Sequence, residues 1–318
     1  MKVMVILAPG FSHLSLGALI EPLHTLGKIA PEHAIEMEIG TIGKDEVVSA
    51  AGLAVSCPVS FSGCLKSLKG VDRPDALFLC FGLRTPYAAQ GDIKKLLRTA
   101  HRFGVPILGT GCAAWKMADA GLLEQGRGTV HWATLPAFAE RHLDIAAMDA
   151  LYVTSGHLTS SPGEAAALDM VIAFVADQFG ADLAEQVCSN LMVSFPRRAD
   201  MTQPRNQNAQ LRNAPIKLRQ MVTEMGENLE NPLRVKDIAQ SVGISLRQSE
   251  RLFIAHLGMS PKKYYIRQRL QHGRLLIEHT SMPILEISIA SGFSSRQSFT
   301  LSYRQAFGSP PAHTRRTP

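Results

Sequence analysis

The sequence predicts two domains of different class: an α/β domain with a doubly wound, mostly parallel sheet covered by helices on both faces, and an all-α domain with two helix-turn-helix units. Three observations support this division. Apolar strand-like runs alternate with helical patterns over residues 1–195, an octapeptide is repeated near the other end of the chain, and the charge changes sign between the two regions. With 318 residues, of which 46% are hydrophobic, the chain is long and apolar enough to bury two cores.

The alternation of strands and helices in residues 1–195 predicts the parallel sheet. Three short apolar runs that end near Gly or Pro are interpreted as buried strands: Val3–Leu7, Ala76–Phe81 and Val105–Leu108. Residues Leu14–Ile29 and Asp92–Phe103 have helical periodicity, and Ile35–Ile39 alternates strictly, as in an edge strand with one wet face. Helices that connect parallel strands must cover both faces of the sheet.

A polar stretch separates the two regions. Residues 196–214 are rich in amide side chains, which predicts a linker between a domain at 1–195 and a helical domain at 215–318. No apolar run approaches the roughly 20 residues of a membrane span, and the start of the chain lacks a signal-peptide cleavage site. The five cysteines are odd in number and lack metal-site spacing, so we expect reduced thiols in a cytoplasmic protein, with no metal and no cofactor.

The positive charge of the chain is concentrated in its second region. Residues 201–318 contain 17 Lys and Arg against 7 Asp and Glu, whereas residues 1–200 contain 16 against 20. A basic region of this kind favours a polyanionic partner such as nucleic acid, although a solvated basic surface has the same composition. Charge alone leaves both interpretations open.

An internal repeat makes the interpretation of the basic region more specific. Ile238–Ser245 recurs as Ile287–Ser294, the two glycines of the repeat lie 49 positions apart, and each copy is followed by an Arg-Gln pair. Each copy predicts a helix, a turn at a glycine with positive φ, and a second helix. Ser245 and Ser294 are the expected N-caps of these second helices, each with Gln three residues later in a capping box.

Each second helix is expected to bury an apolar face and to expose Arg, Gln and Glu side chains of the kind that read base edges in the major groove. The predicted DNA-binding residues are Arg247, Gln248, Glu250, Arg251, Arg296, Gln297, Thr300 and Arg304. Glycine-punctuated helix pairs also occur in bundles that never contact DNA, but two copies in a basic region favour double-stranded promoter DNA as partner. Residues Pro261–His279 predict one long helix between the two units.

The region from about 215 to 316 resembles the DNA-binding domain of the AraC/XylS family. The resemblance rests on motifs in both units: Gly243-Ile244-Ser245, Arg251-Leu252-Phe253, Leu257–Pro261, Gly292-Phe293 and Tyr303–Gly308. It implies a transcription regulator, with RNA polymerase as a further partner if the protein is an activator.

Four positions depart from this family's pattern. Leu301 stands where a basic, base-reading residue is common, which predicts weaker or altered readout by the second unit. Ser249 replaces a usual leucine, and Ser288 and Gly273 replace usual alanines. Because glycine within a helix costs up to about 1 kcal/mol relative to alanine, we expect these three changes to reduce stability without breaking the fold.

A cysteine in the first region has the sequence context of a nucleophile elbow. An apolar strand runs into Gly111-Cys112 and then into a helical pattern, where a helix dipole lowers the pKa of a thiol. His131 and Glu21 are the candidate base and acid. The alternative is a small buried cysteine at a strand-helix junction, with His131 lining a pocket, and we favour this alternative.

Residues 1–195 also resemble the glutamine-amidotransferase-like domain of PfpI-type proteins, and more narrowly the version fused to AraC-type domains in GlxA-type regulators. The resemblance rests on these segments: Pro9–Ser12, Glu21-Pro22-Leu23, Ala118–Leu123, Thr129–Trp132 and Ala166–Met170. It implies a flavodoxin-like or amidotransferase-like fold whose nucleophile position falls on Gly111, with Cys112 one residue late. We therefore expect no catalysis; the alternative function is a cysteine-dependent hydrolase or amidotransferase tethered to DNA.

The same resemblance implies that the old active-site region binds a small effector. The pocket residues expected by analogy are Phe11, Glu21, Phe81, Gly82, Gly111, Cys112, Trp115, His131 and Trp132. Similar regulators respond to nitrogen-containing metabolites such as amino acids or quaternary amines, and Glu21 near aromatic side chains suits a cation. A homodimer formed through this domain is also implied.

Overall fold

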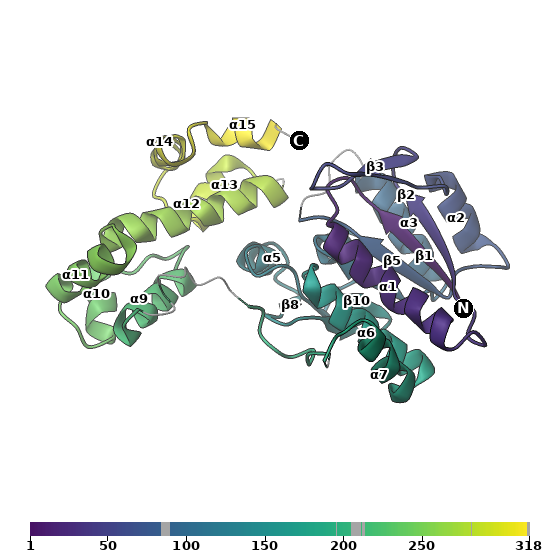
Figure 1. Cartoon of the computed structure of the whole chain (residues 1–318). Helices are drawn as coiled ribbons and strands as arrows, with labels where there is room; N and C mark the ends of the chain where they lie inside the picture. Colours follow the sequence, from purple (N-terminus) through teal and green to yellow (C-terminus); the bar gives the residue numbers. More distant parts are fainter. Residues whose placement is uncertain (84–89, 195, 205–210, 212–213, 281, 317–318) are drawn as a thin grey trace. The chain divides into compact units, whose positions relative to one another are not determined.

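The chain folds into two compact units of different class, Met1–Gln203 and Pro204–Pro318 (Figure 1). The computed structural model describes residues 1–83, 90–194, 196–204, 211, 214–280 and 282–316. The predicted linker falls partly at 205–210 and 212–213, which lie outside these described residues. The first unit is α/β and the second is helical, as the sequence predicts.

The first unit is built on a six-stranded sheet with the order β2-β1-β5-β6-β10-β9. Its strands are β1 (Lys2–Leu7), β2 (Glu36–Thr41), β5 (Ala76–Cys80), β6 (Ile107–Thr110), β9 (Val153–Ser155) and β10 (Leu158–Ser160). Neighbouring strands are parallel except β9, which runs antiparallel to β10. The strictly alternating segment forms the edge strand β2, as predicted. Strand β6 begins after Pro106, because proline has no N–H to donate to the ladder.

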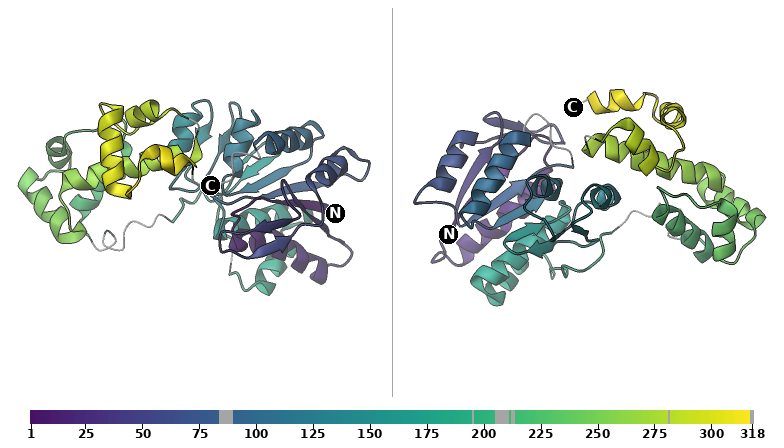
Figure 2. Two further views of the ribbon diagram at one scale, coloured as in Figure 1. Left: turned by 90° about the horizontal axis from the view of Figure 1, so that it is seen from above. Right: turned by 180° about the vertical axis from the view of Figure 1, so that it is seen from behind.

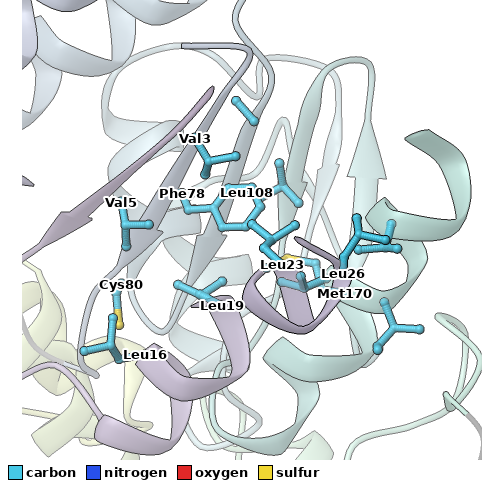
Figure 3. Packing of buried hydrophobic residues seen from close by; sticks show 14 of the residues in the cluster. Val3, Val5, Leu16, Leu19, Leu23, Leu26, Phe78, Cys80, Leu108 and Met170 are labelled. Atoms are coloured by element: carbon cyan, nitrogen blue, oxygen red, sulfur yellow. The ribbon is translucent and has the colours of Figure 1, made fainter. Parts of the chain in front are cut away.

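Helices cover both faces of this sheet. On one face α1 (His13–Ile29) and α6 (Ala165–Phe179) pack on alternate strand residues such as Val3, Val5 and Phe78 (Figure 3), and α7 (Ala181–Asn190) packs against α1 and α6. The other face is covered by α2 (Phe61–Lys69), α3 (Gln90–Arg102) and α4 (Ala113–Asp119) (Figure 2). Burial on both faces explains why β1 and β5 are continuous apolar runs.

The strand order reverses at β1, which has β2 on one side and β5 on the other. In open α/β sheets, ligands bind beyond the carboxyl ends of the strands at such a reversal. Two small two-stranded sheets complete the unit. In one, β3 (Glu46–Val48) pairs with β4 (Ala54–Ser56). In the other, β7 (Arg127–Gly128) pairs with β8 (Ala146–Ala147), which contacts α5 (Leu135–Arg141).

The second unit is all-α, with helices joined by turns and no strand among its described residues. Its helices are α9 (Ile216–Glu227), α10 (Val235–Ser241), α11 (Leu246–Leu257), α12 (Pro261–His279), α13 (Ile284–Ala290), α14 (Arg296–Phe307) and α15 (Pro311–Arg316). The long α12 has the predicted bounds and joins the pair α10–α11 to the pair α13–α14 (Figure 1). Among all described helices, none has the length and apolar character needed to cross a membrane.

Candidate nucleic-acid interface and strand-end cluster

Both helix-turn-helix units turn at a glycine in the left-handed region. Gly243 has φ +76° and Gly292 has φ +71°, which confirms the predicted positive φ values. A Cβ at Gly292 would clash with the carbonyl oxygen of Leu229, whereas the nearest atom to a Cβ at Gly243 is Lys217 Nζ at 3.7 Å. The second turn is therefore restricted to glycine by sterics as well as by conformation.

The second helices of the two units begin with different caps. At α11, Ser245 Oγ accepts from the N–H of Gln248 at 3.2 Å and Gln248 Oε1 accepts from the N–H of Ser245 at 2.8 Å, so the predicted capping box is confirmed. At α14 the N-cap is Ser295, whose Oγ accepts from the N–H of Ser298 at 3.2 Å. The prediction of a capping box at Ser294 is wrong, because the turn between α13 and α14 contains one more residue than the turn between α10 and α11.

The longer turn changes which positions of α11 and α14 are equivalent. Counted from the N-caps, equivalent residues lie 50 positions apart. Burial and helix ends agree with this register in three pairs: Ser249 with Phe299, Phe253 with Tyr303, and the left-handed C-caps Gly258 with Gly308. Arg251 of the first unit therefore corresponds to Leu301 of the second.

The structure places the predicted DNA-binding side chains on the surface of α11 and α14. Seven are exposed and Thr300 is half-buried; the exposed ones are Arg247, Gln248, Glu250, Arg251, Arg296, Gln297 and Arg304. Within the described part of the chain, no hydrogen bond or ion pair engages the guanidinium groups of the four arginines. Gln248 differs, because its Oε1 already serves the cap of α11. Leu301 is 61% exposed on the same helix as Gln297 and Arg304.

The opposite faces of the two helices are buried by different side chains. Ser249 in α11 is fully buried and its Oγ–H donates to the carbonyl of Leu246 at 2.7 Å. In α14, Phe299 and Tyr303 are fully buried, and their ring centroids lie 5.5 Å apart. The helical spacing of Phe299, Tyr303 and Ala306 predicts that all three lie on the buried face, but Ala306 is exposed.

Basic and small residues of α12 hold the second turn in place. Arg269 donates to the carbonyl oxygens of Ser291, at 2.9 Å, and Gly292, so this arginine supports the fold and is not presented to a partner. A Cβ at Gly273 would lie 2.6 Å from the ring of Phe299. The expectation that Gly273 only costs stability misses this contact, because glycine lets α14 approach α12 closely.

In the α/β unit, Met1–Gln203, the loops after β5 and β6 pack backbone to backbone. The N–H of Cys112 donates to the carbonyl oxygen of Gly82 at 2.9 Å. Gly111 has φ +64°, and a Cβ there would clash with the carbonyl oxygen of Phe81. This glycine occupies the elbow position at which the resemblance places a nucleophile, and this backbone leaves no room for a side chain. Cys112 follows as the N-cap of α4, with its side chain 4% exposed.

The loop after β10 brings an exposed carboxylate to the same edge of the sheet. Glu164 has φ +52°, a conformation that few non-glycine residues adopt, and its N–H donates to Ser15 Oγ at 2.7 Å. Ser12 Oγ–H donates to Glu164 Oε2 at 2.6 Å, and the Glu164 side chain does not cap α6. Burial lowers the pKa of His131, and the nearby Glu164 carboxylate acts in the opposite direction. Together these loops form a strand-end cluster of Gly82, Gly111, Cys112, His131 and Glu164.

Only part of the predicted pocket is brought to this cluster. Three predicted aromatic residues are buried in the core: Phe11, Phe81 and Trp115. Glu21 is exposed on α1, and no described contact joins it to the cluster. Trp132 is half-buried beside His131, with ring centroids 5.1 Å apart. No three His, Cys, Asp or Glu side chains among the described residues are grouped to hold a metal ion.

A buried glutamine ties the end of the first unit to the segment that carries His131. Gln203 is 4% exposed, and its Nε2 donates to Thr129 Oγ1 at 3.1 Å and to the carbonyl of Val130 at 2.9 Å. Its Oε1 accepts from the N–H of Trp132 at 2.7 Å. Neither Gln203 nor Glu164 is marked by a clear sequence pattern: Gln203 lies in the predicted linker, and the only local signal for Glu164 is a Gly-Glu pair before a helical pattern.

The chain is similar to known regulators along its whole length. A helix-turn-helix domain family matches residues 238–317. The HTH-type transcriptional regulator ArgR of Pseudomonas aeruginosa is 33% identical over 72% of this chain and 70% of its own length. The HTH-type transcriptional regulators CdhR of Pseudomonas aeruginosa and GlxA of Rhizobium meliloti are each 29% identical over 98% of this chain, and 90% and 94% of their own lengths are covered.

Solved structures share the fold. An AraC family transcriptional regulator from Pseudomonas putida matches 60% of this chain and 98% of its own, with a TM-score of 0.52 and 23% identity. A THiJ/PfpI family protein from Pseudomonas syringae matches 76% of this chain and 90% of its own, with a TM-score of 0.51 and 19% identity. At these identities the likeness concerns the fold alone.

Proposed function

The chain belongs to the GlxA-type regulators, DNA-binding transcription regulators of the AraC family with a PfpI-like domain, and from this premise we propose how it recognises DNA and a signal. Helices α11 and α14 read base edges of double-stranded promoter DNA in the major groove. The observation that carries this assignment is that each helix buries one face and exposes arginines without a described partner on the other. Arginine reads guanine through two parallel hydrogen bonds.

The base-reading assignment is tested by comparing Arg251 with Lys262, an exposed residue at the start of α12. Arg251→Ala is expected to weaken binding to a selected duplex by about 1–3 kcal/mol and to relax the preference at one base pair. Lys262→Ala is the matched control, expected to weaken selected and random duplexes alike and to reduce the salt dependence, as for a phosphate contact. Equal losses on selected and random DNA for Arg251→Ala contradict the assignment.

The first unit is proposed to be a sensor without catalytic activity. Gly111 at the elbow position supports this, because it supplies no nucleophile and a side chain there would clash. The proposed effector is a nitrogen-containing metabolite with a cationic group, such as an amino acid or a quaternary amine. The exposed carboxylate of Glu164 in the strand-end cluster supports a cationic ligand better than Glu21 does. Dimerisation through this unit, and contact with RNA polymerase in the case of activation, complete the proposal.

The sensor proposal is tested by thermal shift of the full chain against amino acids, betaines and polyamines. A true effector raises the unfolding temperature of wild type and of Cys112→Ala, because it binds the folded state, and it is recovered unchanged. Glu164→Gln, which keeps the shape and removes the charge, is expected to lose that shift. A compound consumed by wild type but not by Cys112→Ala contradicts the proposal and supports a cysteine-dependent hydrolase or amidotransferase.

Gln203 is the proposed link between the effector and the DNA-binding unit. It holds the end of the first unit against Thr129–Trp132, the segment that includes His131. Gln203→Ala is expected to keep the effector's thermal shift but to reduce the effector's influence on DNA affinity. An unchanged influence on DNA affinity, measured by titration with and without effector, contradicts this role.

A further inference from the structure

We propose that Leu301 reads the C5-methyl group of a thymine, so that the two helix-turn-helix units of one chain recognise chemically different half-sites. This inference rests on the proposed function, because it concerns the same DNA-reading helices. It adds the base that the second unit selects and the side chain that selects it.

Leu301 lies on the exposed face of α14. Gln297 precedes it by four residues and Arg304 follows it by three, so all three side chains lie on one face of α14. The opposite face is closed by Phe299 and Tyr303, which are fully buried. Leu301 is 61% exposed and thus stands as an apolar side chain within a polar surface.

Leu301 of α14 and Arg251 of α11 occupy equivalent positions in the two helices. Both residues are the sixth helical residue after their N-caps, Ser295 and Ser245. If the two helices dock alike, these side chains meet the same place in successive half-sites. Arg251 offers hydrogen-bond donors there and Leu301 offers none, so one protein position selects two different chemistries.

The major groove of DNA presents one apolar group that suits a leucine side chain. The thymine methyl is the apolar group that base edges present in the major groove, and the other edges present hydrogen-bond donors and acceptors. A leucine placed against those polar edges leaves them without partners, which is unfavourable. Gln297, one turn before Leu301, is suited to adenine. The second half-site is therefore expected to be rich in A·T pairs, and the first to contain a guanine for Arg251.

A protein partner is the competing occupant of an exposed leucine. The surroundings favour DNA, because Gln297 and Arg304 are exposed on the same face of α14 and the Arg304 guanidinium has no described partner. An apolar protein surface placed there would leave this charge poorly solvated. The experiment below separates the two occupants.

The test replaces thymine by deoxyuridine, which lacks only the C5-methyl group. Duplexes are selected from a random pool with the full chain, and each thymine of the selected site is then replaced in turn. For wild type, one replacement in the half-site of α14 is expected to weaken binding about four-fold, the value of one buried methyl-sized group. For Leu301→Ala the same replacement is expected to have no effect. Leu301→Arg is expected to select guanine at that base pair, as Arg251 does in the first half-site.

Ile254→Ala is the matched control, because Ile254 is an exposed apolar residue of α11, 59% exposed. This variant is expected to keep the full deoxyuridine effect in the half-site of α14. The inference is overturned if no thymine of that half-site is sensitive, or if wild type and Leu301→Ala are equally sensitive. Selection that yields no preferred sequence refutes the proposed function itself and this inference with it, whereas selection without coupling to Leu301 refutes the inference alone.

Discussion

The two helix-turn-helix units have the same backbone plan and are stabilised in different ways. In the first helix-turn-helix pair, the small Ser249 lies on the buried face of α11, and this pair shares a core with α9 that includes Met221 and Met225. The second pair has Phe299 at the equivalent position, and this ring packs against Phe293, Tyr303 and Gly273 of α12. The difference shows that the repeat preserves helix lengths and a glycine with positive φ in each turn, while the turn length and the core packing differ between the two copies.

The largest expected effect of this difference is at the two equivalent core positions. Phe299→Ala is expected to lower the free energy of unfolding by about 3–5 kcal/mol, because it opens a cavity in place of a fully buried ring. Ser249→Ala, the matched change in the first unit, removes only a hydroxyl bonded to the Leu246 carbonyl and is expected to cost about 1 kcal/mol or less. Urea denaturation of the full chain, with hydrogen exchange to locate the loss in α13 and α14, measures both. Similar costs at the two positions contradict the comparison.

A smaller effect on the free energy of unfolding is expected where α12 packs against the second helix-turn-helix pair, α13–α14. In Gly273→Ala the new Cβ meets the ring of Phe299 and Ser291 Oγ, 2.6 and 2.7 Å away before relaxation. Overpacking of this kind costs about 1–3 kcal/mol, against a gain of up to about 1 kcal/mol in helix propensity. We expect net destabilisation in urea denaturation, and a smaller loss when Phe299→Leu makes room. A net gain in stability shows that the close approach of α14 to α12 is not required.

The smallest expected effect concerns the N-cap Ser295, which sets where α14 begins and thus which residues of α14 correspond to those of α11. Ser295→Ala is expected to cost about 1 kcal/mol, because it leaves the N–H of Ser298 without its acceptor. The neighbouring Ser294→Ala is expected to change stability by less than about 0.5 kcal/mol. Thermal denaturation of both variants checks this order. The reverse order restores the register of the bare repeat and removes the equivalence of Arg251 and Leu301.

Local periodicity predicts most of the fold class and the helices α11 and α14. Apolar runs bounded by glycine predicted the buried strands, because burial on both faces of a sheet leaves a continuous signal. The helix Pro261–His279 was predicted to the residue, because Ser260 is a good N-cap and proline is favoured at the first helical position. Those signals act over a few residues and are therefore visible in the chain itself.

Contacts between distant segments decided the rest. Glu164 is positioned by Ser12 and Ser15, 152 and 149 residues away, and Gln203 is buried against Thr129, 74 residues away. No local pattern encodes such pairs, because the partner side chains meet only when the sheet brings their loops to one edge. The register of α14 is similar, since Ser294 and Ser295 are both suitable caps in the sequence. Phe299 fits against Gly273 without a clash when Ser295 is the N-cap of α14.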